Sequence, residues 1–184
     1  MYASDRAVVS TLKQALDLAA PFDPSVVGVT VDTFHVWWDP EVLPQLDRAG
    51  AEGRIATYQV CDWRTPLPAD VLLGRHYPGD GVIDFATLTA AVEATGYTGD
   101  IEVEIFNQEI WDTPFAEAVA RTAAGFDAAV VPSGMPPATS TNTGLDPAAP
   151  AAPRVAVSSM PRRLSSIDAR RSGPSGMVKK PPRQ

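Results

Sequence analysis

The chain has 184 residues, of which 45% are apolar, so it is large enough to form one domain with a hydrophobic core. Its net charge of −7 combines two opposite parts. Residues 1–132 carry 7 basic and 20 acidic side chains, whereas residues 133–184 carry 8 basic and 2 acidic ones. Because nucleic-acid binding depends on clustered Lys and Arg, we do not expect the acidic part to bind nucleic acid. Its charge is typical of a soluble enzyme that holds a cation.

The location of the protein is indicated by three features of the sequence. The one cysteine, Cys61, cannot form a disulfide within the chain, so nothing points to an oxidising compartment. The sequence has no run of 18 apolar residues, and its N-terminus lacks the pattern of a secretory signal. We therefore expect a cytoplasmic protein without membrane contact.

The first half of the chain alternates between helical and extended patterns. Apolar residues recur at helical spacing over 4–20, where Ser4 is the expected N-cap, and two prolines follow. The β-branched run 26–34 predicts a buried strand. A second helix is predicted over 40–49 with Asp39 as its cap, and a second strand over 54–62.

The alternation continues after a long loop that contains the turn PGDG. A helix is predicted over 84–96, with Asp84 as its cap, and a strand over 101–106. A last helix is predicted over 113–126 with Thr113 as its cap. Strands that alternate with helices of this length indicate a parallel sheet of the α/β class. Three strands make a small sheet, so we expect part of a larger architecture.

The periodic pattern stops near residue 132. Residues 132–184 are rich in Pro, Ala, Ser and Gly, and several basic residues follow. Such a composition buries too little apolar surface to offset the entropy of ordering. We therefore expect one domain over 1–131 and a disordered tail over 132–184. A basic tail can contact nucleic acid or an anionic membrane, but a solvated tail without a function is the simpler expectation.

Each predicted strand has one apolar face and one face with polar groups toward its C-terminal end. Because the carboxyl ends of parallel strands meet at one edge, Asp32, Gln59 and Glu104 are expected to lie close together. A divalent cation would relieve the repulsion between two carboxylates there, and oxygen donors favour Mg²⁺ or Mn²⁺. The alternative is that these side chains only form hydrogen bonds with neighbouring loops. The polar residues His35, Asp62 and Arg64 follow just beyond the strand ends and are candidates for substrate binding.

Four segments together resemble the last strands of the sugar phosphate isomerase/epimerase family, the xylose isomerase-like barrels related to AP endonucleases. These segments are VDTFHVWWDP, YQVCDWR, PGDGVIDF and GYTGDIEVEIF. The resemblance covers residues 4–126 and implies the C-terminal half of a (β/α)₈ barrel.

The resemblance also implies roles for particular residues. Asp32 and Glu104 take the positions of metal-binding Asp and Glu residues, and His35 and Arg64 take positions that contact substrate in many members. Gln59 stands where many relatives have His, and its neutral amide oxygen favours Mg²⁺ or Mn²⁺. Glu104 would be one of two glutamates that remove and return a proton next to a carbonyl. The other glutamate of that pair precedes the part of the barrel that this sequence resembles.

The residues and the resemblance are compatible with several functions. The resemblance favours metal-dependent isomerisation or epimerisation of a sugar, sugar phosphate or related keto-polyol, impaired here by the missing glutamate. One alternative is a lyase that dehydrates an inositol-type ketone. The other is a non-catalytic remnant or binding module of the same fold. A carbohydrate is the expected partner in each enzymatic case, and the open edges of a partial sheet favour self-association.

Overall fold

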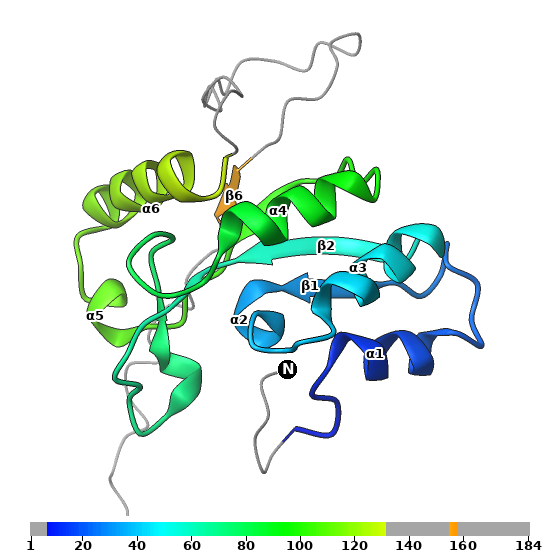
Figure 1. Cartoon of the computed structure of the whole chain (residues 1–184). Helices are drawn as coiled ribbons and strands as arrows, with labels where there is room; N and C mark the ends of the chain where they lie inside the picture. The colour runs from blue at the N-terminus through cyan, green and yellow to red at the C-terminus, as the bar shows by residue number, and fades with distance from the viewer. Residues whose placement is uncertain (1–6, 132–154, 158–184) are drawn as a thin grey trace, which may run out of the picture.

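A parallel sheet with helices packed along it forms the centre of the computed structural model, which describes residues 7–131 and 155–157 (Figure 1). The strand order is β1-β2-β5-β6, and each neighbouring pair is parallel. These strands are β1 (Val29–Asp32), β2 (Ile55–Val60), β5 (Ile101–Val103) and β6 (Val155–Val157). The predicted α/β class with a parallel sheet is confirmed, and the arrangement is that of part of a (β/α)₈ barrel.

The four predicted helices are present in the predicted order. The helices are α1 (Leu12–Ala19), α2 (Thr33–Val36), α3 (Val42–Ala51), α4 (Phe85–Ala94), α5 (Gln108–Trp111) and α6 (Phe115–Ala129). The short helices α2 and α5 were not predicted. Between β2 and α4 the chain also forms a short antiparallel pair, β3 (Asp62–Trp63) with β4 (Arg75–His76), joined through the 3₁₀ helix η1 (Val71–Gly74). In the described part of the chain, no helix has both the length and the apolar character to cross a membrane.

The first helix is shorter than predicted. It begins at Leu12, because Thr11 forms a capping box with Gln14. Residues 7–11 are not helical, and Ser4, the expected cap, lies outside the described residues. The helix predicted over 113–126 begins at Phe115 after Pro114, and the Thr113 hydroxyl donates to Glu109 O instead of capping it.

Two further boundaries differ from the prediction. The helix predicted over 40–49 begins at Val42, and the Asp39 carboxylate accepts a hydrogen bond from Glu41 N just before it. The first strand ends at Asp32, whose side chain accepts from Phe34 N and so starts α2.

The sheet has one more strand than the three that the sequence predicts. The fourth strand is β6, which pairs with β5 and comes from the segment predicted to be disordered. Residues 155–157 thus form a strand within the range predicted as a tail. The rest of the predicted tail, 132–154 and 158–184, lies outside the described residues.

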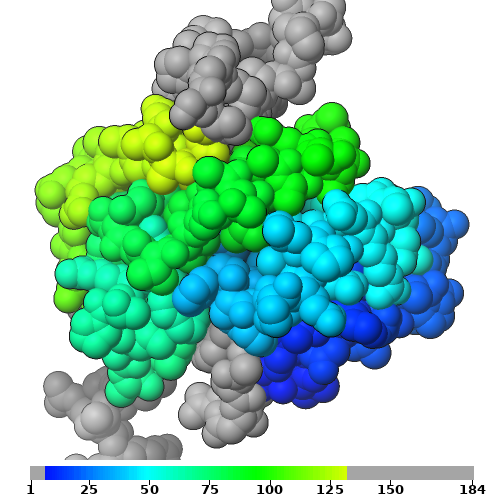
Figure 2. Space-filling view, in the orientation of Figure 1, coloured from blue at the N-terminus to red at the C-terminus, as the bar shows by residue number. Residues whose placement is uncertain are grey.

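One face of the sheet forms the core, as the alternating pattern predicts. Buried apolar side chains from β1, β2 and β5 pack against the helices, namely Val29, Val31, Tyr58, Val60, Ile101 and Val103. Helices α1, α3 and α4 lie side by side and cover this face, and they form a continuous blue-to-green surface in Figure 2. The opposite face carries Thr30 and Thr57, which are exposed. The helices therefore bury the apolar side and leave the polar side open.

The N-cap of α4 offers a direct test of the predicted capping role of Asp84. Asp84 accepts hydrogen bonds from Thr87 N and Thr87 Oγ1, which lower the pKa of its carboxyl group. We expect Asp84→Ala to lower the free energy of unfolding by about 1 kcal/mol at pH 7. Because the folded-state pKa is lowered, the contribution is present above the ordinary pKa and is lost as the pH falls through the folded-state value.

Urea denaturation at pH 7 and below pH 3 measures this effect. Asp127→Ala, at an exposed site within α6, is the matched control and should change stability by less than about 0.5 kcal/mol. An equal loss in both variants would contradict the capping role.

Candidate functional site

A cavity of about 270 Å³ lies at the C-terminal ends of the strands. Four of the predicted site residues line it, namely Asp32, His35, Gln59 and Glu104. Asp32 ends β1, Gln59 lies near the end of β2, and Glu104 directly follows β5. The parallel sheet therefore brings side chains from three strands to one place, as the sequence predicts.

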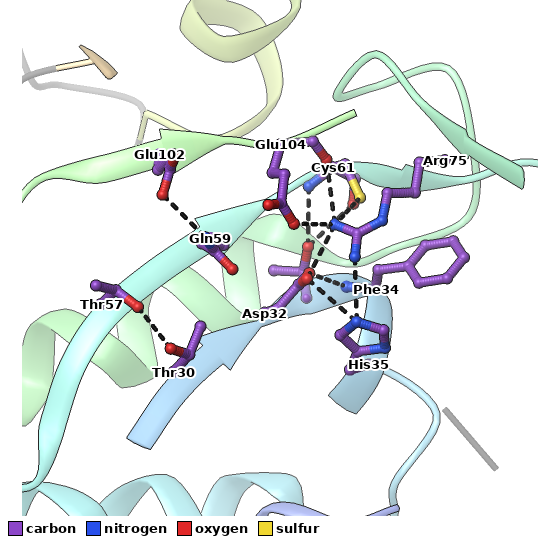
Figure 3. A network of polar contacts seen from close by, with 11 residues as sticks. Thr30, Asp32, Phe34, His35, Thr57, Gln59, Cys61, Arg75, Glu102 and Glu104 are labelled. Atoms are coloured by element: carbon purple, nitrogen blue, oxygen red, sulfur yellow. Dashed lines mark hydrogen bonds and ion pairs between the residues drawn. The ribbon is translucent and has the colours of Figure 1, made fainter. Parts of the chain in front are cut away.

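The two carboxylates converge on a residue that the sequence interpretation does not include, Arg75 of β4. Its Nη1 atom lies 2.9 Å from Asp32 Oδ2 and 2.9 Å from Glu104 Oε2 (Figure 3). The Arg75 side chain is 2% exposed, so this ion-pair cluster is largely shielded from water. The charge of one guanidinium thus stabilises two carboxylates that would otherwise repel each other.

Arg75 has further contacts besides the two carboxylates. Its guanidinium carbon lies 4.9 Å from the ring centroids of both Phe34 and Phe106. Nη1 also donates to Glu104 O at 3.2 Å, and Asn107 donates to the Arg75 carbonyl at 2.9 Å. The sequence interpretation missed Arg75 because it treated residues 63–83 as a loop, whereas the β3–β4 pair returns Arg75 to the strand ends. The one signal in the sequence is an arginine three residues before the PGDG turn.

His35 lies beside this cluster and is neutral. Its Nε2 atom is 3.1 Å from Arg75 Nη2 and 3.5 Å from Asp32 Oδ2. A guanidinium can only donate, so Nε2 accepts this hydrogen bond. Burial, and next the charge of Arg75, lower the pKa of His35 to about 3. Burial also raises the pKa of Asp32, against the opposing effect of Arg75.

Gln59 lines the cavity but has a different partner from the other site residues. The strand register places it between Asp32 on one side and Glu102 on the other. Its Nε2 donates to Glu102 Oε2 at 2.9 Å, so the amide is fixed by the neighbouring strand (Figure 3). Two residues earlier on the same face of β1 and β2, the Thr57 hydroxyl donates to Thr30 Oγ1 at 2.9 Å. Polar pairs therefore line this face of the sheet up to the site.

Asp62, which the sequence predicts to contact substrate, lies outside the cavity of Asp32 and Glu104 and is bonded to the backbone. Its side chain is buried, and both oxygens accept hydrogen bonds from backbone amides. Oδ1 accepts from Trp63 and Ile83, and Oδ2 accepts from Gly79 and Gly81, at distances of 2.8 to 3.1 Å. A Cβ at Gly81 would collide with this carboxylate, so the turn needs glycine there. Asp62 holds the PGDG turn in place.

Arg64 also lies elsewhere. Its Nη1 is 3.0 Å from His76 Nε2, and it lines a separate cavity of about 370 Å³ together with Tyr77, Asp80 and Arg121. It does not line the cavity of Asp32 and Glu104. The predicted contact between Arg64 and a substrate in that cavity is therefore not supported by this geometry.

The predicted metal ligands fit a hard cation in charge and in donor type. Asp32 and Glu104 already direct one oxygen each to a single cationic atom, so the position between them accommodates positive charge. Gln59 lines the same cavity and carries a neutral oxygen donor. Among the described residues, no three His, Cys, Asp or Glu side chains lie close enough to one another to hold a metal ion.

The sequence is similar to a known family of barrel proteins and to enzymes of known name. Residues 1–128 match the family model of xylose isomerase-like TIM barrels. The chain is 36% identical over 107 residues to a 3-dehydroshikimate dehydratase of Pseudomonas aeruginosa. The match covers 54% of this chain and 16% of that protein. It is 26% identical over 113 residues to an inosose isomerase of Bacillus subtilis, which covers 60% of this chain and 40% of that protein. The chain thus spans less than half of each relative.

Two solved structures are also similar. Protein SMc04130 of Sinorhizobium meliloti matches with a TM-score of 0.63 and 43% identity over 68% of this chain and 46% of that one. An IolI protein with a bound zinc atom matches with a TM-score of 0.58 and 23% identity over 68% and 45% of the two chains. The second likeness shows the fold alone.

Proposed function

Because the chain belongs to the xylose isomerase-like TIM barrel family, we propose that its cavity binds a small polyhydroxylated ketone and that Glu104 moves a proton next to the carbonyl. The observation that carries this proposal is the convergence of Asp32 and Glu104 on one cationic position at the strand ends. A fixed positive charge between a carboxylate base and a carbonyl oxygen is what enolisation needs.

Glu104 is suited to the role of base. Its side chain is 23% exposed, whereas that of Asp32 is 5% exposed, so Glu104 is the carboxylate that a ligand in the cavity reaches more easily. Glu104 would take the proton from the carbon next to the carbonyl. His35 is neutral and so can form a hydrogen bond with a hydroxyl or carbonyl of the ligand without adding charge.

A divalent ion belongs to the same proposal. Asp32, Gln59 and Glu104 would hold Mn²⁺ or Mg²⁺, which supplies positive charge next to the carbonyl oxygen when bound. Oxygen donors without a thiolate or imidazole favour these ions over softer ones. The zinc atom of the IolI structure supports metal binding in general but does not decide which metal.

Isomerisation and dehydration share this first step, and one observation favours dehydration as a second candidate. The identity to 3-dehydroshikimate dehydratase is 36%, against 26% to the inosose isomerase. After a proton leaves the carbon next to a ketone, loss of a hydroxyl group gives dehydration, whereas reprotonation at a different carbon or face gives isomerisation or epimerisation.

Solvent exchange tests the shared step. The full chain is incubated with Mn²⁺ in D₂O, with 3-dehydroshikimate in one sample and inosose in another, and NMR follows the hydrogen next to the carbonyl. One base is sufficient for exchange, so we expect deuterium to enter even if the second carboxylate of a complete reaction is missing. Loss of water or movement of the carbonyl would identify the further reaction. Exchange no faster than in a protein-free sample with both ketones would contradict the proposal.

A further inference from the structure

We propose that Arg75 is a built-in cation that occupies the Asp32–Glu104 pair in the absence of metal and has to leave it before a divalent ion binds. This inference rests on the metal site of the proposed function. It goes beyond that site because it makes metal binding an exchange of one cation for another. The ion that replaces the Arg75 guanidinium is a divalent cation with a preference for oxygen donors.

The position of Arg75 is the first argument. Its Nη1 is at the hydrogen-bonding distance of 2.9 Å from Asp32 Oδ2 and also from Glu104 Oε2. A metal ion bound to both oxygens would be centred in the region that Nη1 now fills. Two positive charges in van der Waals contact repel each other strongly inside a protein, so the guanidinium and the metal exclude each other.

The incomplete bonding of Arg75 is the second argument. Its Nε atom is buried and has no hydrogen-bond partner among the described residues, so the guanidinium is not fully satisfied in this position. Besides the two carboxylates, the guanidinium contacts only neutral groups in the described part of the chain. These are Glu104 O, Cys61 Sγ, His35 Nε2 and the Phe34 and Phe106 rings. In the proposed exchange the guanidinium leaves the two carboxylates and keeps its contact with the rings.

The absence of a competing anchor is the third argument. Nη2 contacts His35 Nε2, whose imidazole is neutral and itself lines the cavity. In the described part of the chain, Arg75 forms ion pairs with the Asp32 and Glu104 carboxylates and with no other carboxylate. Whatever neutralises these two carboxylates therefore also releases Arg75.

Competition of this kind lowers the apparent affinity for metal. If the metal binds only the fraction of molecules in which Arg75 has left, the apparent Kd is the intrinsic Kd divided by that fraction. A minor state of ~0.1–10% would make the apparent Kd ~10- to 1000-fold weaker. Removing the guanidinium should therefore lower the apparent Kd for metal by the same factor.

Titration of Mn²⁺ into the full chain, followed by the EPR signal of free Mn²⁺, tests the proposal. We expect Arg75→Met to bind Mn²⁺ at least about tenfold more tightly than the wild type. The matched control is Arg64→Met, which removes an arginine of the same β3–β4 region that contacts His76 instead of the carboxylates. Its affinity should equal that of the wild type. An Arg75→Met variant that is folded by circular dichroism but binds no tighter than the wild type would overturn the proposal.

A second measurement does not depend on the folding of Arg75→Met. The ¹⁵Nε signal of Arg75 in the wild-type chain is followed by NMR during titration with Mg²⁺, with Arg64 as internal reference. We expect the Arg75 signal to shift in step with metal binding and the Arg64 signal to stay constant. An Arg75 signal that stays constant while Mg²⁺ saturates the site would overturn the inference.

The variant Asp32→Asn separates this inference from the proposed metal site. If Asp32→Asn loses Mn²⁺ binding while Arg75→Met binds no tighter than the wild type, the metal site stands and the competition is refuted. If no variant binds Mn²⁺, both are refuted.

Discussion

Glu104→Gln is expected to slow deuterium exchange next to the ketone carbonyl by ~10²–10⁴-fold, the usual cost of losing a general base. Gln keeps the size and one oxygen acceptor of the side chain but cannot take a proton at neutral pH. It also removes one of the two charges that contact Arg75. The measurement is the NMR rate of exchange in D₂O with saturating ketone and Mn²⁺.

Glu102→Gln is the matched control for this experiment. Glu102 lies in β5, two residues before Glu104, and accepts a hydrogen bond from Gln59 instead of contacting Arg75. We expect its exchange rate to stay within about threefold of the wild type, because no proton transfer is assigned to it. If both variants lose the same activity, Glu104 is not the specific base. If Glu104→Gln retains the wild-type rate, the base lies elsewhere.

Asp62→Ala is expected to lower the free energy of unfolding by at least about 3 kcal/mol. The carboxylate accepts hydrogen bonds from four backbone amides, and its residue is only 1% exposed. Each buried donor left without a partner costs roughly 1–3 kcal/mol, although water entering the space recovers part of this. The expected loss is a large fraction of the stability of a small domain. Denaturation by urea, with circular dichroism as the signal, gives the value.

Asp70→Ala provides the comparison for Asp62. Asp70 is exposed, and its carboxylate accepts a hydrogen bond from Leu72 N at the start of η1. Its loss should cost only about 0.5–2 kcal/mol, as for other capping residues. A smaller loss for Asp62→Ala than for Asp70→Ala would show that the PGDG turn does not depend on the Asp62 carboxylate.

The alternating faces of the strands could be predicted because they follow from local geometry. Val31 and Asp32 are neighbours in sequence, and a strand must place them on opposite faces. The helices cover the apolar face of the sheet and leave its polar face open. The convergence of Asp32 with Glu104 follows from the same rule, since both lie at the carboxyl ends of parallel strands.

The partners of these residues could not be predicted because they come from distant, irregular segments. Arg75 reaches the carboxylates through the β3–β4 pair, two strands of two residues each that have no periodic pattern. Asp62 looks like a site residue from its position at a strand end. Only the fold shows that its oxygens face the amides of Gly79 and Gly81. The identity of a polar residue does not tell whether it serves a ligand or the backbone.

The observed ends of some helices and strands differ from the predicted ones because capping side chains set them. The helical pattern over 4–20 continues upstream of Leu12, but the capping box of Thr11 and Gln14 starts the helix there. The strand predicted to end near residue 34 ends at Asp32, because its side chain caps α2. In both cases a single side chain that bonds to the backbone overrides a longer hydrophobic pattern.

The location of a bound metal ion tests the central claim most directly. Crystals of the full chain grown with Mn²⁺ would be measured at an X-ray energy that gives an anomalous signal from manganese. We expect one anomalous peak in contact with Asp32 Oδ2 and Glu104 Oε2, with the Arg75 guanidinium displaced from between them. A manganese peak away from both carboxylates, or Arg75 still bridging them in crystals that contain bound manganese, would contradict the account.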